Sequence, residues 1–369
     1  MTTSTVYSCD DHLDLSAVPP TVWSSRLPSA MAERGPHVVD EGKGRQWVCE
    51  GRVIGRSGMP RNTELVKKLS AIGRAGIDDD GYRAGTPKLR LEDLDRDGLA
   101  ASVVYGPLSL GFPITDPALQ TATYAAWNDW AAEEFNATAP DRLCALAFLP
   151  FHSSEAAADE LERCASIGHR GAIVDAFSVE LGDPAWDRVW SVAEATGLPI
   201  SFHINGGVSP KLSYQIGKWQ SAAFATLLPM QLDEPLATMV FCGALERHPG
   251  LRLVLAESGI GWLPYLLDRM DAQWRELGPK LDDAPKVAPS ELVRNQVTLT
   301  FEQEPRADQF IPLVGADSCM WASDYPHTDS TFPNSQQAIA DTLGALSSAD
   351  VRKITATNCA RLYGFPIDV

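Results

Sequence analysis

The chain has 369 residues, of which 44% are hydrophobic and 21% are charged, so it can bury a large core as one decorated barrel or as two smaller domains. Its formal net charge of −17 at pH 7 opposes binding to nucleic-acid backbones and anionic membrane surfaces, which excludes nucleic acid as an expected partner. Residues 1–7 lack the features of a signal peptide and no run of about 18 apolar residues occurs, so we predict a cytoplasmic protein with no membrane partner.

The N-terminal quarter of the chain predicts one short strand followed by an insertion. An apolar run at about 6–9 predicts the strand, and the polar stretch at 10–14 follows it at once. From about residue 15 to 90, prolines and glycines interrupt every periodic pattern, although 46–49 and 52–54 predict a small hairpin. Because a structureless loop of that length is improbable in a compact domain, we interpret this segment as a cap inserted after the first strand.

From residue 91 onward, predicted helices and strands alternate regularly. We expect seven further strands at about 101–105, 144–149, 171–174, 199–203, 251–257, 295–301 and 319–322. Helices are predicted before or between them at about 91–98, 117–136, 154–167, 184–196, 235–247 and 262–277. This alternation implies a parallel sheet, and eight strand–helix units close into a (β/α)8 TIM barrel. We therefore predict an α/β fold with a single barrel domain over residues 1–369.

An open doubly wound sheet is the alternative fold for the same alternation. No G-x-G-x-x-G or G-x-x-x-x-G-K-[ST] sequence opens a helix, so the pattern indicates no nucleotide site of the usual kind. A second long interval at 204–234 follows the fifth strand and contains Trp219, Phe224 and Met230. Because barrel active sites lie at the C-terminal ends of the strands, we expect this loop and the cap to close a partly aromatic pocket that suits a sizeable substrate.

Side chains that can bind a metal follow four of the predicted strands. They are Asp10, Asp11 and His12 after the first strand, His203 after the fifth, Glu257 after the sixth, and Asp324 and His327 after the eighth. In a barrel these strand ends meet in one mouth, where carboxylates repel each other unless a cation lies between them. Each residue alone is more often a helix cap or a hydrogen-bonded structural group, and Asp14 either joins the set or pairs within the cap. Because side chains that can bind a metal follow four different strands, we predict a metal site.

The chain resembles the amidohydrolase superfamily over nearly its whole length, in particular the branch that contains amino-carboxymuconate-semialdehyde decarboxylase and the aromatic-acid decarboxylases. The resemblance is carried by Phe-His at 202–203, His-Pro-Gly-Leu-Arg-Leu at 248–253, Ser-Asp-Tyr-Pro at 323–326 and the C-terminal helix at 358–364. In that branch the metal is held by strand one, by the strand-five histidine and by the strand-eight aspartate. The resemblance therefore implies Asp10, His12, His203 and Asp324 as ligands.

Departures from the decarboxylase pattern point to a different chemistry. Glu257 stands where the decarboxylase-like members carry the histidine of a Gly-His-x-Gly signature, and His327 is an additional imidazole after Asp324. Strand four supplies only Asp175 and no lysine, and the seven cysteines form no C-x-x-C pair. This set of candidate metal-binding side chains resembles that of nonheme diiron monooxygenases with a TIM barrel. An example is the type that hydroxylates a diterpenoid intermediate in platensimycin and platencin biosynthesis. The resemblance implies a metal set of Asp10, His12, His203, Glu257, Asp324 and His327, with Asp11 as the alternative to Asp10.

We therefore predict an oxidoreductase of secondary metabolism, a monooxygenase with two irons per chain that hydroxylates an unactivated carbon of a CoA-linked or terpenoid substrate. Glu257, Asp324 and His327 would be catalytic, and dioxygen and an external electron donor would be required because no flavin or ferredoxin motif is visible. The alternative is a hydrolase or non-oxidative decarboxylase with one zinc or manganese ion. A barrel without catalysis is least favoured because polar residues stand at four strand ends. A homo-oligomer is compatible with the sequence.

Overall fold

Parallel strands form the centre of the fold. The computed structural model describes residues 5–40, 42, 44–58, 81–110, 113–205, 212, 218–327 and 329–367. Within this part, one sheet has the order β1-β5-β6 and a second has the order β7-β8-β9-β10-β11-β12, with parallel pairing throughout. The strands are β1 (Tyr7–His12), β5 (Ala101–Tyr105), β6 (Leu143–Ala145), β7 (Ala147–Phe148), β8 (Ala172–Ile173), β9 (Ile200–His203), β10 (Leu253–Ala256), β11 (Val297–Phe301) and β12 (Cys319–Trp321). The predicted α/β class with a parallel sheet is confirmed.

The two sheets are joined by the chain itself at one junction and by backbone hydrogen bonds at the other. Leu146 separates β6 from β7, and its NH donates to a carbonyl of β5 at 3.0 Å. At the other junction, the NH of Asp324 donates to the carbonyl of Asp10 at 3.0 Å, and the NH of His12 donates to the carbonyl of Tyr325 at 2.7 Å. The residues that follow β12 therefore lie directly beside β1.

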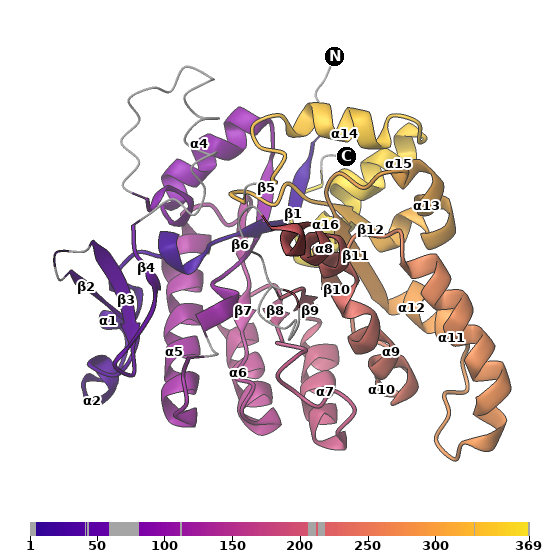
Figure 1. Ribbon diagram of the computed structural model, residues 1–369, viewed down its shortest axis with the longest axis horizontal. Coiled ribbons are helices and arrows are strands. Elements are labelled where there is room, and N and C mark those ends of the chain that lie inside the picture. Colours follow the sequence, from indigo (N-terminus) through magenta and orange to yellow (C-terminus); the bar gives the residue numbers. More distant parts are fainter. Residues whose placement is uncertain are drawn as a thin grey trace.

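Helices surround the strands (Figure 1). They include α4 (Pro87–Asp97), α5 (Pro117–Trp130), α6 (Ser154–Ser166), α7 (Asp187–Thr196), α9 (Asp233–Phe241), α10 (Ala244–Arg247), α11 (Leu263–Leu277), α12 (Pro289–Gln296), α13 (Ala307–Val314), α14 (Ser335–Leu343), α15 (Ser348–Arg352) and α16 (Asn358–Tyr363). Fully buried Trp127, Trp190 and Trp321 pack in the core between helices and strands. Over the described ranges, none of the helices combines the length and the apolar character needed to cross a bilayer.

β1 and α12 differ from the sequence prediction. β1 does not end before Asp10 but continues through His12, and its polar residues are buried. Ser8 donates to Asp11 within the strand, and Thr300 of β11 donates to Asp10 Oδ2. The sequence predicted no element between the helix at 262–277 and the strand at 295–301, but residues Pro289–Gln296 form α12. This helix has only 8 residues, too few for its apolar pattern to recur over several turns, and Leu292 and Val293 are among those buried.

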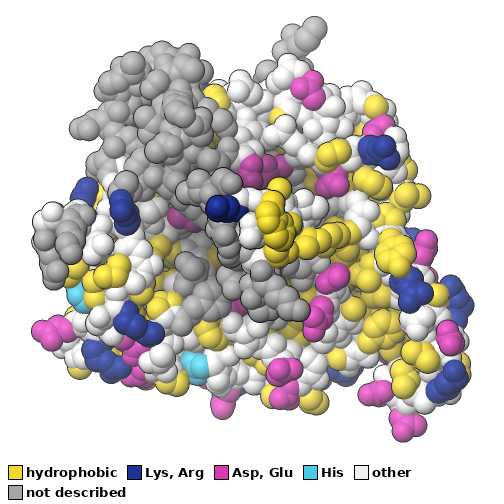
Figure 2. All heavy atoms as spheres, viewed as in Figure 1, with side chains coloured by type: hydrophobic (Ala, Val, Ile, Leu, Met, Phe, Trp, Pro, Cys, Tyr) yellow, Lys and Arg dark blue, Asp and Glu magenta, His cyan; other side chains and the backbone are white. Residues whose placement is uncertain are grey.

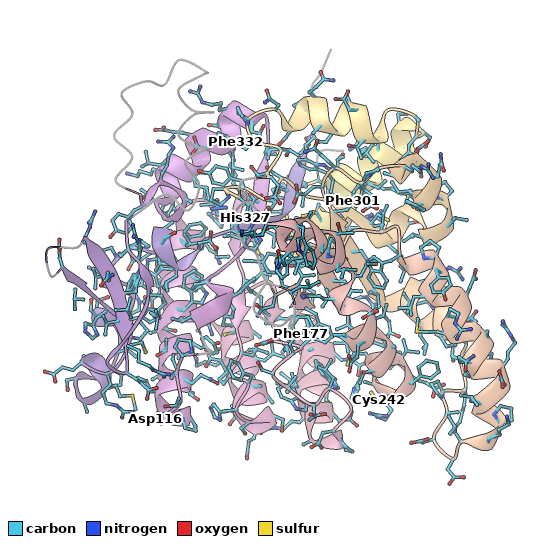
Figure 3. All side chains as sticks on the ribbon, in the orientation of Figure 1. Asp116, Phe177, Cys242, Phe301, His327 and Phe332 are labelled. Atoms are coloured by element: carbon cyan, nitrogen blue, oxygen red, sulfur yellow. The ribbon has the colours of Figure 1, made fainter. Side chains whose placement is uncertain are left out.

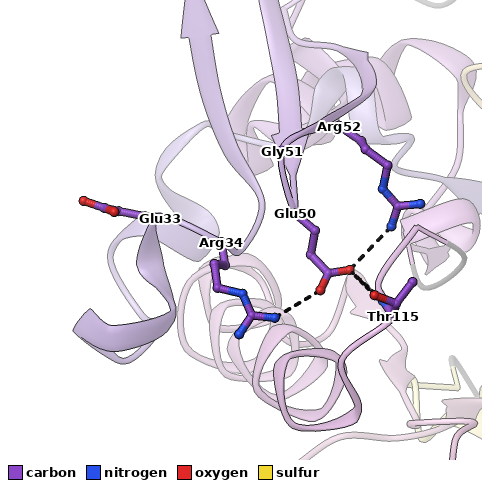
Figure 4. Close-up of a pocket in the computed structure, with 6 residues that line it drawn as sticks. All are labelled: Glu33, Arg34, Glu50, Gly51, Arg52 and Thr115. Atoms are coloured by element: carbon purple, nitrogen blue, oxygen red, sulfur yellow. Dashed lines mark hydrogen bonds and ion pairs between the residues drawn. The ribbon is translucent and has the colours of Figure 1, made fainter.

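A small antiparallel sheet lies within the predicted cap, and it contains the expected hairpin. It is formed by β2 (His37–Asp40), β3 (Arg45–Cys49) and β4 (Arg52–Arg56), preceded by α1 (Thr21–Ser24) and α2 (Ser29–Ala32). Glu50 in the turn after β3 accepts hydrogen bonds from the NH and the hydroxyl of Thr115, just before α5. Glu50 also pairs with Arg34 and Arg52 around a surface hollow that none of the predicted metal ligands lines (Figure 4). The cap over 15–90 stays a prediction, since residues 59–80 lie outside the described part.

The predicted long loop after the fifth strand contains a helix, α8 (Trp219–Leu227). Phe224 is buried, whereas Trp219 is 71% exposed and Met230 is 37% exposed. Figure 2 shows hydrophobic side chains gathered over α8 near the centre of that face. Trp219 therefore does not wall a closed aromatic pocket, contrary to expectation, because the helix directs it toward solvent. Residues 206–211 and 213–217 of the same interval are outside the described ranges.

Candidate metal site

The six predicted ligands converge at the C-terminal ends of β1, β9, β10 and β12. Ligand atoms of Asp10, His12 and His203 all lie within 4.8 Å of one another, and the same holds for His12, Glu257, Asp324 and His327. His12 belongs to both groups, so the two groups share one small volume. Figure 3 shows His327 in the interior, close to the ends of the strands. All four strands are distant from one another in sequence, and the parallel pairing brings their ends together.

Four buried polar atoms at the centre of this group have no hydrogen-bond partner among the described residues. They are Asp10 Oδ1, His12 Nε2, His203 Nε2 and Asp324 Oδ1. His12 Nε2 lies 3.2 Å from Asp324 Oδ1 and 3.5 Å from Asp10 Oδ1, and His203 Nε2 also lies 3.5 Å from Asp10 Oδ1. Buried polar atoms are normally satisfied, so four of them facing one another indicate the place of a cation. Carboxylate and imidazole donors fit manganese, zinc or iron.

His203 is oriented by its own backbone neighbour. Its Nδ1 lies 2.7 Å from the carbonyl oxygen of Ile204, which directs Nε2 toward Asp10 and Glu257. Such a bond to the remote ring nitrogen is the usual way in which a protein orients a metal-binding histidine. Burial lowers the pKa of His203, but the carboxylates of Asp10 and Glu257 outweigh it and raise that pKa to about 9. The ring therefore carries a proton at neutral pH until a cation replaces it.

Glu257 is the most exposed carboxylate of the group. Its Oε2 lies 3.4 Å from His203 Nε2 and 3.7 Å from His12 Nε2, and its side chain is 24% exposed. Its φ of +53° lies in the left-handed region, which non-glycine residues rarely adopt outside functional or tight positions. The NH of Glu257 donates to Thr300 Oγ1 at 2.7 Å, and that hydroxyl donates to Asp10 Oδ2 at 2.8 Å. Burial, with the charge of Asp324, raises the pKa of Glu257 to about 8.

His327 forms a pair with Asp324. Its Nδ1 lies 2.9 Å from that carboxylate, and its ring stacks on His12 with a centroid distance of 4.0 Å. Burial lowers the pKa of His327, but the charges of Asp324 and Asp14 raise it well above its ordinary value. Burial raises the pKa of Asp324, but His327 and His12 outweigh it and lower that pKa to about 2. Asp14 thus contacts His327, at 3.5 Å, and lies outside both ligand groups.

Asp11 lies outside the two ligand groups. Its carboxylate accepts hydrogen bonds from the hydroxyls of Ser8 and Ser102 and from the NH of Tyr325. Neighbouring residues of a strand point to opposite faces, so Asp10 faces the site while Asp11 faces away from it. Burial raises the pKa of Asp11 to about 6 even though Arg90, 3.7 Å away, lowers it.

Three residues near the site were not predicted. Thr300 lies inside β11, where a threonine looks like any other strand residue, so no signal could have identified it. Arg90 is in α4, and only the fold brings it to the carbonyl of His12. Glu302 follows β11 directly, and its place after a buried strand was the same signal that identified Glu257. Burial and the nearby charge of Asp324 raise the pKa of Glu302 well above its ordinary value.

Most of the chain matches one family model, described as Amidohydrolase, over residues 82–365. A γ-resorcylate decarboxylase from Rhizobium sp. is 29% identical over 297 residues, which cover 74% of this chain and 86% of the relative. An amidohydrolase from Mycobacterium avium subsp. paratuberculosis K-10 has a similar structure, with a TM-score of 0.79, 21% identity and coverage of 99% of this chain and 100% of that chain. The structure of a dihydroxybenzoic acid decarboxylase from Polaromonas sp. JS666 was solved with bound manganese and the inhibitor 2-nitroresorcinol. It is similar with a TM-score of 0.66 and 20% identity, and the match covers 98% of this chain and 97% of that chain.

The prediction of a monooxygenase is wrong. The similar sequence named above is a decarboxylase, and the similar decarboxylase structure was solved with manganese. This overturns the predicted oxidoreductase class, the two irons per chain, and the requirement for dioxygen, an electron donor and a CoA-linked or terpenoid substrate. The error has a physical reason, because the same carboxylate and imidazole donors bind manganese, zinc or iron, and the inventory alone fixes neither the number of metals nor the reaction.

Proposed function

Because this chain belongs to the amidohydrolase family, we propose that it is a metal-dependent, non-oxidative decarboxylase of a small aromatic carboxylic acid. The observation that carries the proposal is the set of four buried, facing atoms in Asp10, His12, His203 and Asp324 that lack hydrogen-bond partners among the described residues. The γ-resorcylate decarboxylase that is similar in sequence supports the substrate class. This is the alternative function that the sequence left open.

The fold that supports this function is a closed (β/α)8 barrel, with a cap after β1. The continuous chain from β6 to β7 and the hydrogen bonds between β1 and the residues after β12 support closure, and so does the amidohydrolase of similar structure. Closure would place the ends of all the strands around one mouth. The candidate ligands lie at these ends, and the described part of the cap is bonded to the segment that follows β5.

Asp10, His12, His203 and Asp324 would together hold one divalent cation. When bound, manganese or zinc would supply a positive charge that polarises the carboxylate-bearing ring of the substrate. Thr300 holds Asp10 in place through its hydroxyl, and His327 holds Asp324. These contacts keep the carboxylates oriented before a cation arrives, as is usual for the groups around a metal site.

Glu257 would carry the proton that the reaction consumes. In decarboxylation the bond between the ring carbon and the carboxylate breaks, its electron pair stays on the ring, and a proton replaces the carbon dioxide that leaves. The raised pKa of Glu257 lets its carboxyl group hold a proton near neutral pH, and its partial exposure leaves it accessible to a substrate. Glu257 also stands where the resembling decarboxylases carry a histidine.

Anaerobic turnover by manganese-loaded protein tests this function. We expect carbon dioxide release, with formation of the ring product, from at least one of γ-resorcylate, 2-hydroxybenzoate and the 2,3-, 2,4- and 2,5-dihydroxybenzoates. Asp324→Asn is the control, and it should release none because a cation ligand is lost. If the loaded wild-type protein releases no carbon dioxide from any of these acids, or consumes oxygen with them, the proposed function is refuted.

A further inference from the structure

The turn that follows β10 holds Glu257 in an uncommon backbone conformation. The φ angles of Glu257 and Gly259 are +53° and +61°, both in the left-handed region. A non-glycine residue is strained there and keeps this conformation only where its surroundings enforce it. The NH of Glu257 donates to Thr300 Oγ1, and Trp262 Nε1 donates to the carbonyl of Ser258 at 2.7 Å. These bonds fix the first half of the turn.

Glu304, which follows β11, bonds to the second half of the same turn. Its Oε2 accepts a hydrogen bond from the NH of Ile260 at 3.2 Å, and the NH of Gly261 also donates to its carboxylate. A Cβ atom at Gly259 or Gly261 would come within 2.7 Å or 2.9 Å, respectively, of one of its oxygens. The absence of side chains at both positions therefore lets the carboxylate lie directly against the turn.

The contacts of Glu304 link a helix and a candidate catalytic group. Burial raises the pKa of Glu304, although the hydrogen bonds from Ile260 and Gly261 lower it, so a carboxylate here is poorly solvated. The two NH groups precede α11, which begins at Leu263, so Glu304 anchors that helix. They also belong to the turn of Glu257, whose Oε2 lies 3.4 Å from His203 Nε2. A displacement of this turn would move a carboxyl group that stands beside the metal site.

We propose that Glu304 is a positioning residue for proton transfer, because its bonds to the turn keep the Glu257 carboxyl group directed toward the metal site. This inference rests on the proposed function, in which Glu257 supplies the proton to the ring carbon. Glu304 belongs to neither ligand group in the described part of the chain, so it acts through the turn and not on the cation. Its loss should slow the chemical step and leave the binding of manganese and of the aromatic acid nearly unchanged.

Glu304→Ala in manganese-loaded protein tests the inference. The probe is γ-resorcylate, or whichever benzoate named above the wild-type protein decarboxylates fastest. The single-turnover rate of carbon dioxide release at saturation should fall about tenfold or more, because a displacement of about 1 Å can slow a reaction about 100-fold. The Kd values of the acid and of Mn²⁺ should stay within about threefold of wild type. Glu304→Gln keeps an oxygen that accepts from an NH, so its rate should stay within about threefold of wild type.

A double-variant cycle separates the positioning of Glu257 from the anchoring of α11. Glu257→Gln has already lost the proton donor, so adding Glu304→Ala should lower its remaining rate by about twofold or less. Anchoring alone would lower the rate by the same factor in both backgrounds. Wild-type turnover in Glu304→Ala, or an equal loss in both backgrounds, would overturn the inference and leave the proposed function standing. Failure of the wild-type protein to release carbon dioxide would overturn both.

Glu246→Ala is the matched control. Glu246 is also partly buried, and its Oε1 accepts hydrogen bonds from the NH groups of Lys286 and Val287 at 2.8 Å and 3.1 Å, in the loop before α12. It belongs to α10, which precedes β10, whereas Glu257 follows that strand. Its loss should lower stability without changing the rate of carbon dioxide release. If Glu304→Ala does not fold, Glu304→Asp replaces it with the same expected loss, because its shorter side chain withdraws the carboxylate from the turn.

Discussion

Two adjacent aspartates of β1 have different partners. Asp10 faces the unsatisfied ring nitrogens of His12 and His203, whereas Asp11 is enclosed by Ser8 and Ser102. We predict that Asp10→Asn lowers manganese affinity by about 100-fold or more, because a charged ligand is lost. Asp11→Asn should leave the affinity within a few-fold and instead lower the free energy of unfolding of the metal-free protein by about 1–3 kcal/mol. Titration with Mn²⁺ monitored by electron paramagnetic resonance, together with denaturant unfolding, measures both effects.

Equal losses of metal affinity in the two variants would contradict this assignment, because they would mean that both carboxylates reach the cation or that neither does. The comparison is well matched. The two substitutions are chemically identical, lie one residue apart and both affect buried side chains.

Substitution of Glu257 distinguishes the residues needed for cation binding from those needed for turnover. If it carries the proton for the ring carbon, Glu257→Gln should retain manganese but reduce turnover by about 100-fold or more, in line with the loss of a general acid. Glu257→His would supply another group that holds a proton, so it should recover part of the activity. Single-turnover carbon dioxide release and metal content per chain provide the two readouts. Wild-type turnover in Glu257→Gln would contradict the role.

The proton on His203 makes cation binding depend on pH. In the metal-free protein its pKa is raised to about 9, so the ring is charged at pH 7 and must lose a proton before Nε2 can bind a cation. Affinity for Mn²⁺ should therefore increase about tenfold per pH unit as pH rises toward 9, and should level off above it. Calorimetry at pH 7 in two buffers of different ionisation enthalpy should show that about one proton is released per cation. An affinity independent of pH between 6 and 9 would contradict a charged His203.

At the scale of elements, α4 is tied to two of the four strands that carry candidate ligands, β1 and β12. The fully buried Arg90 donates to the carbonyl of His12 at 3.0 Å and to that of Tyr325 at 3.4 Å, and it lies 3.7 Å from Asp11. Arg90→Met should cost about 3–5 kcal/mol of stability, because it leaves a buried carboxylate without its cation. It should also weaken manganese binding by about tenfold, since His12 and Asp324 lose a common anchor.

Arg170→Met is the matched control for Arg90. Arg170 also donates to a backbone carbonyl, that of Leu143 at 2.7 Å, but at the start of β6 and thus at the opposite end of the strands. Its loss should lower stability without changing manganese affinity. The double variant Arg90→Met/Asp11→Asn should be less destabilised than the sum of its parts, because no unpaired charge remains. Equal effects of both arginines on metal affinity would refute the positioning role.

The sequence predicted the elements that have strong local patterns. The apolar run at 101–105 coincides with β5, and the polar residues at strand ends are the candidate ligands that lie together in the structure. It could not decide between Asp10 and Asp11, because strand register depends on partners distant in the chain. Arg90 was also beyond prediction, since its hydrogen bond to His12 spans 78 residues. The reaction could not be derived from the ligands, because one donor set serves several metals and chemistries.

The whole molecule is arranged so that the site spans a junction between its sheets. Asp10 and His12 belong to the sheet of β1, β5 and β6, whereas His203 and Asp324 belong to or follow strands of the other sheet. Two backbone hydrogen bonds connect these parts near the site. A cation held by all four side chains would add further bonds across the same junction.

We therefore predict that manganese stabilises the fold as a whole. At a free concentration about 1,000 times the Kd, binding to the native state should add about 4 kcal/mol to the free energy of unfolding and raise the Tm by several degrees. Hydrogen exchange should slow most in β1 and in the residues after β12, on the two sides of the junction, and least in β6 and β7. His203→Ala should remove the shift in Tm, while Arg170→Met should retain it. Equal protection of all strands, or a shift that persists in His203→Ala, would show that the cation binds elsewhere.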